Sequence, residues 1–552
     1  MTDAGKKQEW LACPAMTDEL VKELEEMDET ALHDCFYRDL AFGTGGLRGV
    51  LGAGTNRMNL FTVAKATRGL AAFLKEADAS PSCAVSFDSR IHSGDFARLA
   101  AAVLASEGVS VWIYPQLQPT PMLSFAVRFL HTSAGIMITA SHNPARYNGY
   151  KVYGADGCQI TLETAERIQR RISEQPDLAD PLPEFDRFLS TGIIRYITED
   201  TIEAYYRAIS ELSVKPVSEP LHLVYSPLNG TGNVPVREIM KRMNHIRVEI
   251  VSEQEQPDGR FPTCPYPNPE IREAMSLAIQ KTIETGADFC FATDPDCDRM
   301  GAGVRVGNEV RLISGNDMGI LMLDFLCRNK KIHGSLPPVV IKTIVTTEMA
   351  AALCRQYGFE LRNVLTGFKF IGEQIGLLEK ENTANRFLFG FEESYGYLSG
   401  TDVRDKDAVN AALLLCELAS DLKGQGKTML DRLQELREEF GCFVQRLLTF
   451  EYEGENGAMR MSSIMESLRQ PLASFDHVGL REAVRKDYLR DSTGLPKSDV
   501  IEFRMKNGDK WIVRPSGTEP KLKAYLFADA PTQEEAEKKL DVLEGIVNQL
   551  CS

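Results

Sequence analysis

The 552-residue sequence has no long apolar run and no excess of basic charge. No stretch approaches the ~20 apolar residues of a membrane-spanning helix, and even the apolar segment 318–327 contains Asp324. The amino-terminal segment lacks the apolar core of a signal peptide. The formal net charge is −16, whereas broad binding to nucleic acid or to an anionic membrane requires a basic surface. We therefore expect a cytoplasmic protein without a nucleic-acid or membrane partner.

Motifs of several other protein classes are absent as well. The 12 cysteines include no CxxC pair, so we expect reduced, mostly buried thiols rather than zinc or redox sites. The absence of GxxxxGK[ST] disfavours a P-loop kinase. The elbow GxSxG of serine hydrolases does not occur either.

What the sequence does contain is a repeated alternation of apolar strands and helices. At this length the chain is too large for one core. Strand–helix alternation predicts parallel sheets joined by right-handed crossovers. The predicted strands are 83–87, 109–114, 134–139, 221–225, 288–293, 339–345, 360–365 and 386–390. The predicted helices are 96–106, 122–130, 234–243, 270–284, 316–329 and 408–419.

The last hundred residues have a different pattern. Asn507-Gly508 lies between apolar segments at 500–505 and 511–513, which predicts a β-hairpin. Thr532 and Glu535 have the spacing of a capping box at the start of a terminal helix. We therefore predict an α/β protein with domains at 1–205, 206–315 and 316–441, followed by an α+β domain at 442–552.

Ser141 comes directly after the third of these strands. In open α/β sheets, ligands bind beyond the carboxyl ends of strands. The segment 133–153, SAGIMITASHNPARYNGYKVY, places Ser141 beside His142 in a turn, as a nucleophile requires. Lys151 comes within reach if the loop folds back past Asn148-Gly149. An ordinary surface turn is the alternative, and this segment alone does not decide between them.

An acidic turn, DPDCDR, follows the strand 288–293. Asp294, Asp296 and Asp298 can converge on one hard cation, and oxygen ligands favour Mg²⁺ or Ca²⁺ over zinc. An EF-hand is excluded because Arg299 replaces its required glycine and Arg305 its bidentate glutamate. A solvated acidic turn is the alternative.

Two further polar loops carry weaker signals. GFEESYG, at 390–396, offers carboxylates and a hydroxyl suited to sugar hydroxyls, and Lys406 follows in Asp405-Lys406-Asp407. Near the carboxyl end, RPSGTEPKLK at 514–523 combines arginine, hydroxyls, glycine and lysines in a manner suited to a phosphate. Solvated or basic surface loops explain either segment equally well when it is taken alone. GTGGLRG at 43–49 adds Arg48 on a flexible backbone.

Together these segments resemble the α-D-phosphohexomutase superfamily. GTGGLRG, TASHNP, DPDCDR, GFEESYG and RPSGTEPK occur in the family's order over nearly the whole chain. The resemblance implies three related α/β domains with mixed, mostly parallel sheets and a fourth α+β domain, all around one central cleft. It also implies a Mg²⁺-dependent phosphotransferase of the isomerase class that acts on sugar phosphates.

The resemblance assigns a role to each motif. Ser141 matches the phosphoryl-carrying serine, and it completes a Mg²⁺ site with the three aspartates. Arg48 matches an arginine near that serine, and Arg299 a residue beside the metal. Lys151 and Lys406 match positions of proton transfer, whereas His142 is expected to position the phosphoserine. The matched substrate-binding residues are Thr366, Gly367, Glu392, Ser394, Arg514, Ser516, Gly517 and Thr518, and Lys523 in the last segment adds charge for the phosphate.

The implied reaction interconverts glucose 1-phosphate and glucose 6-phosphate through glucose 1,6-bisphosphate. EESYG resembles the glucose-type members, whereas mannose-type relatives carry a histidine in this loop. Action on mannose or pentose phosphates, or net formation of glucose 1,6-bisphosphate, remains an alternative. A phosphatase and a non-catalytic sugar-phosphate-binding scaffold are weaker ones. A monomer or a homodimer is expected.

Overall fold

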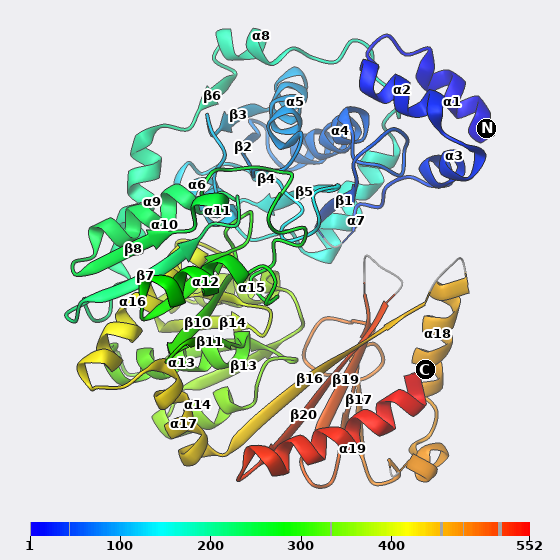
Figure 1. The fold of residues 1–552 in the computed structure, drawn as a ribbon. Helices are drawn as coiled ribbons and strands as arrows, with labels where there is room; N and C mark the ends of the chain where they lie inside the picture. Colours follow the sequence, from blue (N-terminus) through cyan, green and yellow to red (C-terminus); the bar gives the residue numbers. More distant parts are fainter. Residues whose placement is uncertain are drawn as a thin grey trace.

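The computed structural model describes residues 2–43, 45–331, 334–452, 456–478, 480–516 and 521–551. Four sheets follow one another along these residues, and each is built from one continuous stretch of the chain. Figure 1 shows helices around the first three sheets and a long helix across the last one. Within these ranges, no helix is long and apolar enough to cross a membrane. The predicted fold class, three α/β units and a β-rich C-terminal unit with helices, is confirmed.

The first sheet carries the turn that contains Ser141. Its order is β1-β5-β4-β2-β3-β6, with β2 parallel to β3 and β4, whereas β5 is antiparallel to β1 and β4. The sheet is thus mixed, because β5 returns along β4 where the sequence had indicated only a loop. Its elements are β1 (Gly46–Val50), α4 (Leu60–Ala77), β2 (Ser82–Phe87), α5 (Ser93–Ser106), β3 (Ser110–Ile113), α6 (Thr120–Phe129), β4 (Ala134–Ile138), β5 (Tyr147–Gly154), α7 (Leu162–Ser173), α8 (Phe185–Ser190) and β6 (Ile194–Tyr196).

Three short helices precede this sheet and were not predicted. They bury Trp10 between Phe36 and Phe61, whose ring centroids lie 5.4 and 5.3 Å from the Trp10 ring. Asn59 then caps α4 by accepting the backbone N–H groups of Phe61 and Thr62. The helices are α1 (Asp3–Leu11), α2 (Asp18–Glu26) and α3 (Glu29–Phe36).

The second sheet carries the acidic turn between two antiparallel strands. Its order is β11-β10-β9-β7-β8. The helix predicted from residue 270 begins at Ser276, because Asn268 already binds the N–H groups of Glu270 and Ile271. The elements are α9 (Glu199–Glu211), β7 (Leu221–Ser226), α10 (Asn233–Arg242), β8 (Ile246–Ile250), α11 (Ser252–Glu255), α12 (Ser276–Thr285), β9 (Phe289–Thr293), β10 (Met300–Val306) and β11 (Glu309–Ile313).

The third sheet has the order β13-β12-β14-β15 and ends in a hairpin at the GFEESYG segment. The helix predicted at 408–419 is longer, and Asp407 caps it by accepting the N–H groups of Val409 and Asn410. The elements are α13 (Gly315–Asn329), β12 (Val339–Thr343), α14 (Met349–Tyr357), β13 (Glu360–Val364), α15 (Phe368–Lys380), η1 (Ala384–Arg386), β14 (Phe387–Glu392), β15 (Gly396–Leu398), α16 (Ala408–Gly424) and α17 (Met429–Phe440).

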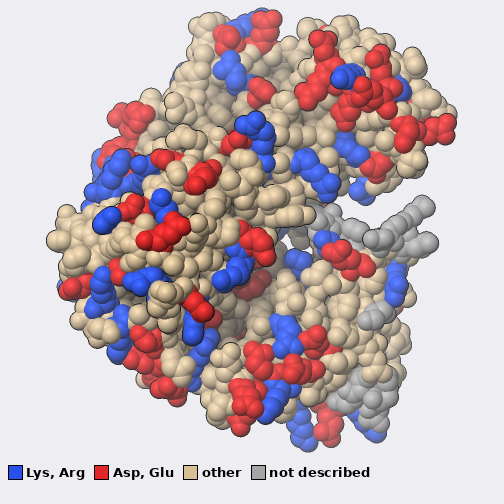
Figure 2. Space-filling model, in the orientation of Figure 1, with Lys and Arg blue, Asp and Glu red and all other residues tan. Residues whose placement is uncertain are grey.

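The fourth sheet is wholly antiparallel, with the order β16-β20-β19-β18-β17. The predicted hairpin joins β18 to β19, and Gly508 adopts the left-handed φ of 92° that its turn requires. Figure 2 shows a hollow between this sheet and the first one. The elements are β16 (Cys442–Glu451), α18 (Asn456–Leu468), η2 (Leu472–Val478), β17 (Val484–Asp487), β18 (Ile501–Arg504), β19 (Lys510–Pro515), β20 (Lys521–Ala530) and α19 (Gln533–Cys551).

Candidate active site

Ser141 lies in a buried turn directly after β4. The residue is only 4% exposed, and its φ of 53° places the backbone in the left-handed region. Its N–H group donates to Oγ1 of Thr139 at 2.8 Å, and its Oγ lies 3.2 Å from Nδ1 of His142. Arg48 on β1 contacts the same turn through Oδ1 of Asn143, at 3.3 Å. The structure therefore brings Ser141, His142 and Arg48 together.

Burial first, and then the positive charges of Arg299 and Arg48, lower the pKa of His142 well below its ordinary value. The imidazole beside Ser141 is thus neutral near pH 7. In this state it can offer one donor and one acceptor to its surroundings.

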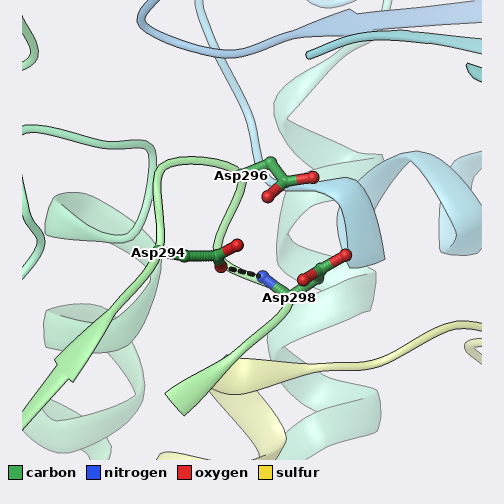
Figure 3. Close-up of side chains that lie close together, drawn as sticks. All are labelled: Asp294, Asp296 and Asp298. Atoms are coloured by element: carbon green, nitrogen blue, oxygen red, sulfur yellow. Dashed lines mark hydrogen bonds between the residues drawn. The ribbon is translucent and has the colours of Figure 1, made fainter. Parts of the chain in front are cut away.

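The acidic turn between β9 and β10 presents three carboxylates on one side (Figure 3). Asp294, Asp296 and Asp298 are at most 1% exposed, and one oxygen from each lies within 4.8 Å of the others. Cys297 closes the turn with a φ of 52°. Oδ1 of Asp294 accepts the N–H groups of Asp298 and Arg299, at 3.1 and 3.0 Å. Asp294 thereby fixes the shape of the turn.

Two oxygens of this cluster, Oδ1 of Asp296 and Oδ1 of Asp298, have no hydrogen-bond partner in the part of the chain that the structure describes. Burial and the two neighbouring aspartates raise the pKa of Asp294 well above its ordinary value. A bound cation would relieve this repulsion and give the unpaired oxygens a partner. The three residues together form a candidate metal-binding triad.

Two lysines from other parts of the chain face the triad, one on β5 and one in the loop between β15 and α16. Nζ of Lys151, on β5, lies 2.8 Å from Oδ2 of Asp296, and Nζ of Lys406 lies 3.0 Å from Oδ2 of Asp298. Although burial alone would raise it, Lys151 holds the pKa of Asp296 below its ordinary value. Lys151 reaches this position because β5 folds back along β4. This folding back is the condition expected from the sequence for Lys151 to approach Ser141.

Lys406 is itself held by a chain of polar contacts. Its Nζ donates to Oδ1 of Asp405 at 2.9 Å, and the hydroxyl of Tyr153 donates to Oδ2 of Asp405 at 2.8 Å. The aliphatic part of Lys406 packs on Gly396, where an added Cβ would lie 2.3 Å from it. The contact with Asp405 and the packing on Gly396 therefore fix the position of the ammonium group.

Arg299 connects the acidic turn to the GFEESYG hairpin. Its Nη1 donates to the carbonyl of Ser394 and to Oε1 of Glu270, both at 3.1 Å. In the hairpin, Oε1 of Glu392 accepts the N–H group of Gly367 at 2.9 Å. Oγ1 of the adjacent Thr366 is buried and finds no hydrogen-bond partner within the described ranges, so it can bind a ligand hydroxyl. The structure thus joins Arg299, Glu392, Ser394, Thr366 and Gly367.

The C-terminal sheet contributes a basic pair. Arg514 on β19 lies directly opposite Lys523 on β20, and among the described residues Nε of Arg514 has no hydrogen-bond partner. The N–H group of Ser516 donates to the carbonyl of Lys521 at 2.7 Å, which shapes the end of the strand. Gly517 and Thr518, which belong to the same predicted cradle, lie outside the described residues.

Three residues of the site were missed in the sequence. Oγ1 of Thr120 donates to Oδ2 of Asp296 at 2.9 Å, Tyr153 holds Asp405, and Arg90 lies against the Ser141 turn. Arg90 follows β2 just as Ser141 follows β4, so the rule used for the other loops could have found it. Thr120 and Tyr153 gave no comparable signal.

Comparison with known proteins accounts for these motifs together. Three family profiles, described as α/β/α domains I, II and III of phosphoglucomutase/phosphomannomutase, match residues 39–178, 203–307 and 314–440. The chain belongs to this family. Its members are enzymes, and both the superfamily and the enzyme class expected from the motifs are confirmed.

Curated relatives match over almost the full chain. The phosphoglucomutase of Staphylococcus haemolyticus (strain JCSC1435) is 36% identical over 539 residues, which cover 95% of this chain and 96% of the relative. That of Staphylococcus aureus (strain USA300) is 35% identical over 542 residues, with the same two coverages.

Solved structures of the family share the fold. A phosphoglucomutase/phosphomannomutase family protein from Burkholderia thailandensis has a TM-score of 0.69 and 19% identity, covering 92% of this chain and 97% of its own. The open form of the Paramecium phosphoglucomutase parafusin also has a TM-score of 0.69, with 17% identity and coverages of 93% and 96%. The four-unit arrangement is therefore that of the family.

Proposed function

We propose that the chain interconverts α-D-glucose 1-phosphate and glucose 6-phosphate, with Ser141 as the phosphoryl carrier and glucose 1,6-bisphosphate as the intermediate. The observation that carries this proposal is the buried Oγ of Ser141, which lies 2.9 Å from Oδ2 of Asp294 in the metal-binding triad. Phosphoryl transfer depends mainly on positioning and on neutralising charge. Both requirements are supported where the Ser141 turn meets the triad and its two lysines.

Asp294, Asp296 and Asp298, together with an oxygen of phosphorylated Ser141, would hold Mg²⁺. An all-oxygen donor set and two unpaired carboxylate oxygens fit this cation. When bound, Mg²⁺ would supply positive charge for the phosphoryl oxygens. The protein residues supply the remaining functions.

In the proposed reaction, the free hydroxyl of a hexose monophosphate attacks the phosphorus of phosphoserine 141, and the bond from phosphorus to Oγ breaks. We propose that Lys151 and Lys406, whose ammonium groups contact the triad, relay the proton of the attacking hydroxyl to the departing Oγ and balance the charge of the transferred group. Neutral His142 would hold the phosphoserine in place, with Arg48 nearby. The bisphosphate then turns over and returns its other phosphoryl group to Ser141.

The remaining predicted residues would hold the two ends of the substrate. We propose that Glu392 and Ser394 bind the sugar hydroxyls and that Thr366 and Gly367 discriminate their orientation, with Arg299 alongside. The cradle for the phosphate that is not transferred would consist of Arg514, Ser516, Gly517, Thr518 and Lys523. The cradle must accept either phosphate in turn, and charged or hydroxyl donors tolerate that exchange.

Two broader proposals rest on less specific observations. The described cysteines are all free and 11 of the 12 are buried, which suits a reducing compartment such as the cytoplasm. Glucose phosphates are favoured as substrates because the curated relatives at 35–36% identity are named phosphoglucomutases.

Intact-mass measurement and a coupled assay test the reaction together. Incubation with glucose 1,6-bisphosphate should add one phosphate to the wild type and to Ser133→Ala, but none to Ser141→Ala. Ser133 is the matched control because it lies at the opposite end of the same strand. Turnover of glucose 1-phosphate should exceed that of mannose 1-phosphate and ribose 1-phosphate. Strong turnover of ribose 1-phosphate with negligible turnover of glucose 1-phosphate would instead assign a pentose phosphate.

A further inference from the structure

Arg90 is a buried arginine to which none of the functions above gives a role. Its side chain lies in the loop after β2, and the residue is 3% exposed. Because β2 and β4 are parallel neighbours, this loop and the Ser141 turn leave the same edge of the sheet. The guanidinium group of Arg90 can therefore contact the Ser141 turn.

The guanidinium group donates to four backbone carbonyls of that one turn. Nη1 binds the carbonyls of Pro144 and Tyr147, at 2.9 and 3.0 Å. Nη2 binds the carbonyls of Ser141 and Asn143. A planar fork with several fixed N–H groups can serve four acceptors at once, whereas the single ammonium group of lysine cannot match this geometry.

These contacts hold an unfavourable conformation. Residues other than glycine rarely adopt the left-handed φ of 53° seen at Ser141, so the surrounding structure must stabilise it. Arg90 binds the carbonyl of Ser141 itself and that of Asn143, two residues later. The direction of the Ser141 side chain is fixed by the same backbone.

Arg90 is in turn fixed by both of the first two domains. Its Nε lies 3.4 Å from Oδ2 of Asp88, whose Oδ1 accepts the hydroxyl of Ser93 at 2.7 Å. The ring of Phe261, from the second domain, lies 5.1 Å from the guanidinium carbon. Beside it, Gly259 packs so closely that an added Cβ would lie 2.4 Å from the N atom of Ile91. The guanidinium group has little freedom to move.

We infer that Arg90 is a positioning residue for the Ser141 hydroxyl. It touches no reacting atom, and it acts by holding the backbone that directs Oγ towards Asp294. The inference rests on the proposed function in one respect only, namely that Ser141 carries the phosphoryl group. Loss of the Arg90 guanidinium group should leave the proposed sugar and phosphate contacts of the third and fourth domains in place.

The test compares Arg90→Lys with Arg305→Lys, because Arg305 also binds three backbone carbonyls, those of Ala287, Gly307 and Gly286, away from the site. Arg90→Lys should lower kcat about 100-fold, the cost of a misplacement near 1 Å, and leave KM within about threefold. Hydrogen exchange in the ligand-free protein should rise about tenfold or more over residues 139–148, corresponding to the loss of a stabilising contact of ordinary strength. Arg305→Lys should leave kcat, KM and the exchange over residues 139–148 unchanged.

The double variant Asp88→Asn/Arg90→Met removes the buried charge pair as a unit, so it keeps the test valid if Arg90→Lys does not fold. A folded variant with kcat within threefold of the wild type and unchanged exchange over 139–148 would overturn the inference. A fall in kcat that is matched by an equal rise in KM would also count against it. If the wild type acquires no phosphate, the proposed function fails, while the exchange measurement still decides whether Arg90 holds the turn.

Discussion

The hydroxyl of Ser141 donates a 2.9 Å hydrogen bond to Oδ2 of Asp294, and this bond joins the first sheet to the second. Each residue follows the carboxyl end of a buried strand. A phosphoryl group on Ser141 would bring further negative charge to a place that already holds three carboxylates. Positive charge is therefore a requirement of the site, and the first two predictions concern its sources.

We expect Asp296→Asn to lower Mg²⁺-dependent turnover by at least about 100-fold, which corresponds to roughly 3 kcal/mol of lost transition-state stabilisation. The fold should persist, because the backbone of the turn is held by Asp294 rather than by Asp296. Mg²⁺ should also raise the thermal midpoint of the wild type but not of the variant. Turnover at several Mg²⁺ concentrations and thermal unfolding measure these effects, with the exposed Asp95→Asn as control. Normal turnover in Asp296→Asn would refute the metal site.

Separate replacements of Lys406, Asp405 and Tyr153 should reduce kcat to decreasing extents. Lys406→Met should reduce kcat by about 10²–10⁴-fold, the range typical of a lost proton-transfer group. Asp405→Asn should reduce kcat less, because Asp405 only holds the ammonium group of Lys406. Tyr153→Phe should reduce kcat least, because Tyr153 contacts Asp405 and acts on Lys406 only through it. Steady-state kinetics measures the order, with Lys423→Met as a matched control near the far end of α16. An equal loss in all three variants would indicate that they act through folding instead.

The order of the motifs and their places after strands were accessible from the sequence because local patterns encode them. Ser141 and the acidic turn each follow a buried apolar strand, and the structure finds them there. The strand β5, which contains Lys151, was not predicted from the sequence. Asn148-Gly149 suggested a turn. In the structure, Gly149 instead allows β5 to pack closely against the backbone of Thr139, because an added Cβ would lie 2.5 Å from the carbonyl oxygen of Thr139.

The partners of the motifs could not be derived from local patterns. Thr120 meets Asp296 across 176 positions of sequence, and Tyr153 meets Asp405 across 252. A buried threonine or tyrosine looks the same in sequence whether it packs in a core or supports a site. Only the tertiary fold separates the two roles, so these residues emerged from the structure alone.

We expect Arg514→Ala to raise KM for glucose 1-phosphate about tenfold or more and to leave the Mg²⁺ requirement unchanged. A charge-assisted hydrogen bond contributes about 1.5–3 kcal/mol, and Arg514 lies on the C-terminal sheet rather than at the triad. Arg504→Ala, on the neighbouring strand β18, provides the control and should leave KM unaltered. Altered Mg²⁺ dependence with a normal KM would contradict the assigned role.

The last prediction concerns the contact between the third and fourth domains, where Glu348 lies between two buried lysines. Its Oε1 contacts Nζ of Lys510 and lies 3.6 Å from Nζ of Lys342. Lys342 and Lys510 are 0% and 3% exposed. Although burial alone would raise it, these two charges lower the pKa of Glu348 from 4.5 to about 2. The ionised carboxylate is thus favoured by folding.

Because this pKa is depressed in the folded protein, its contribution to stability is present above pH 4.5 and is lost as the pH falls towards 2. Glu348→Gln should lower the free energy of unfolding by about 3 kcal/mol at pH 7, since it removes the carboxylate that faces two buried ammonium groups. The difference from the wild type should shrink steadily below pH 4.5. Denaturant unfolding at pH 7, 5 and 3 measures it, and Glu482→Gln, whose side chain is 70% exposed, serves as control. A difference that stays constant over this range would show that Glu348 stabilises the interface by packing and not by its charge.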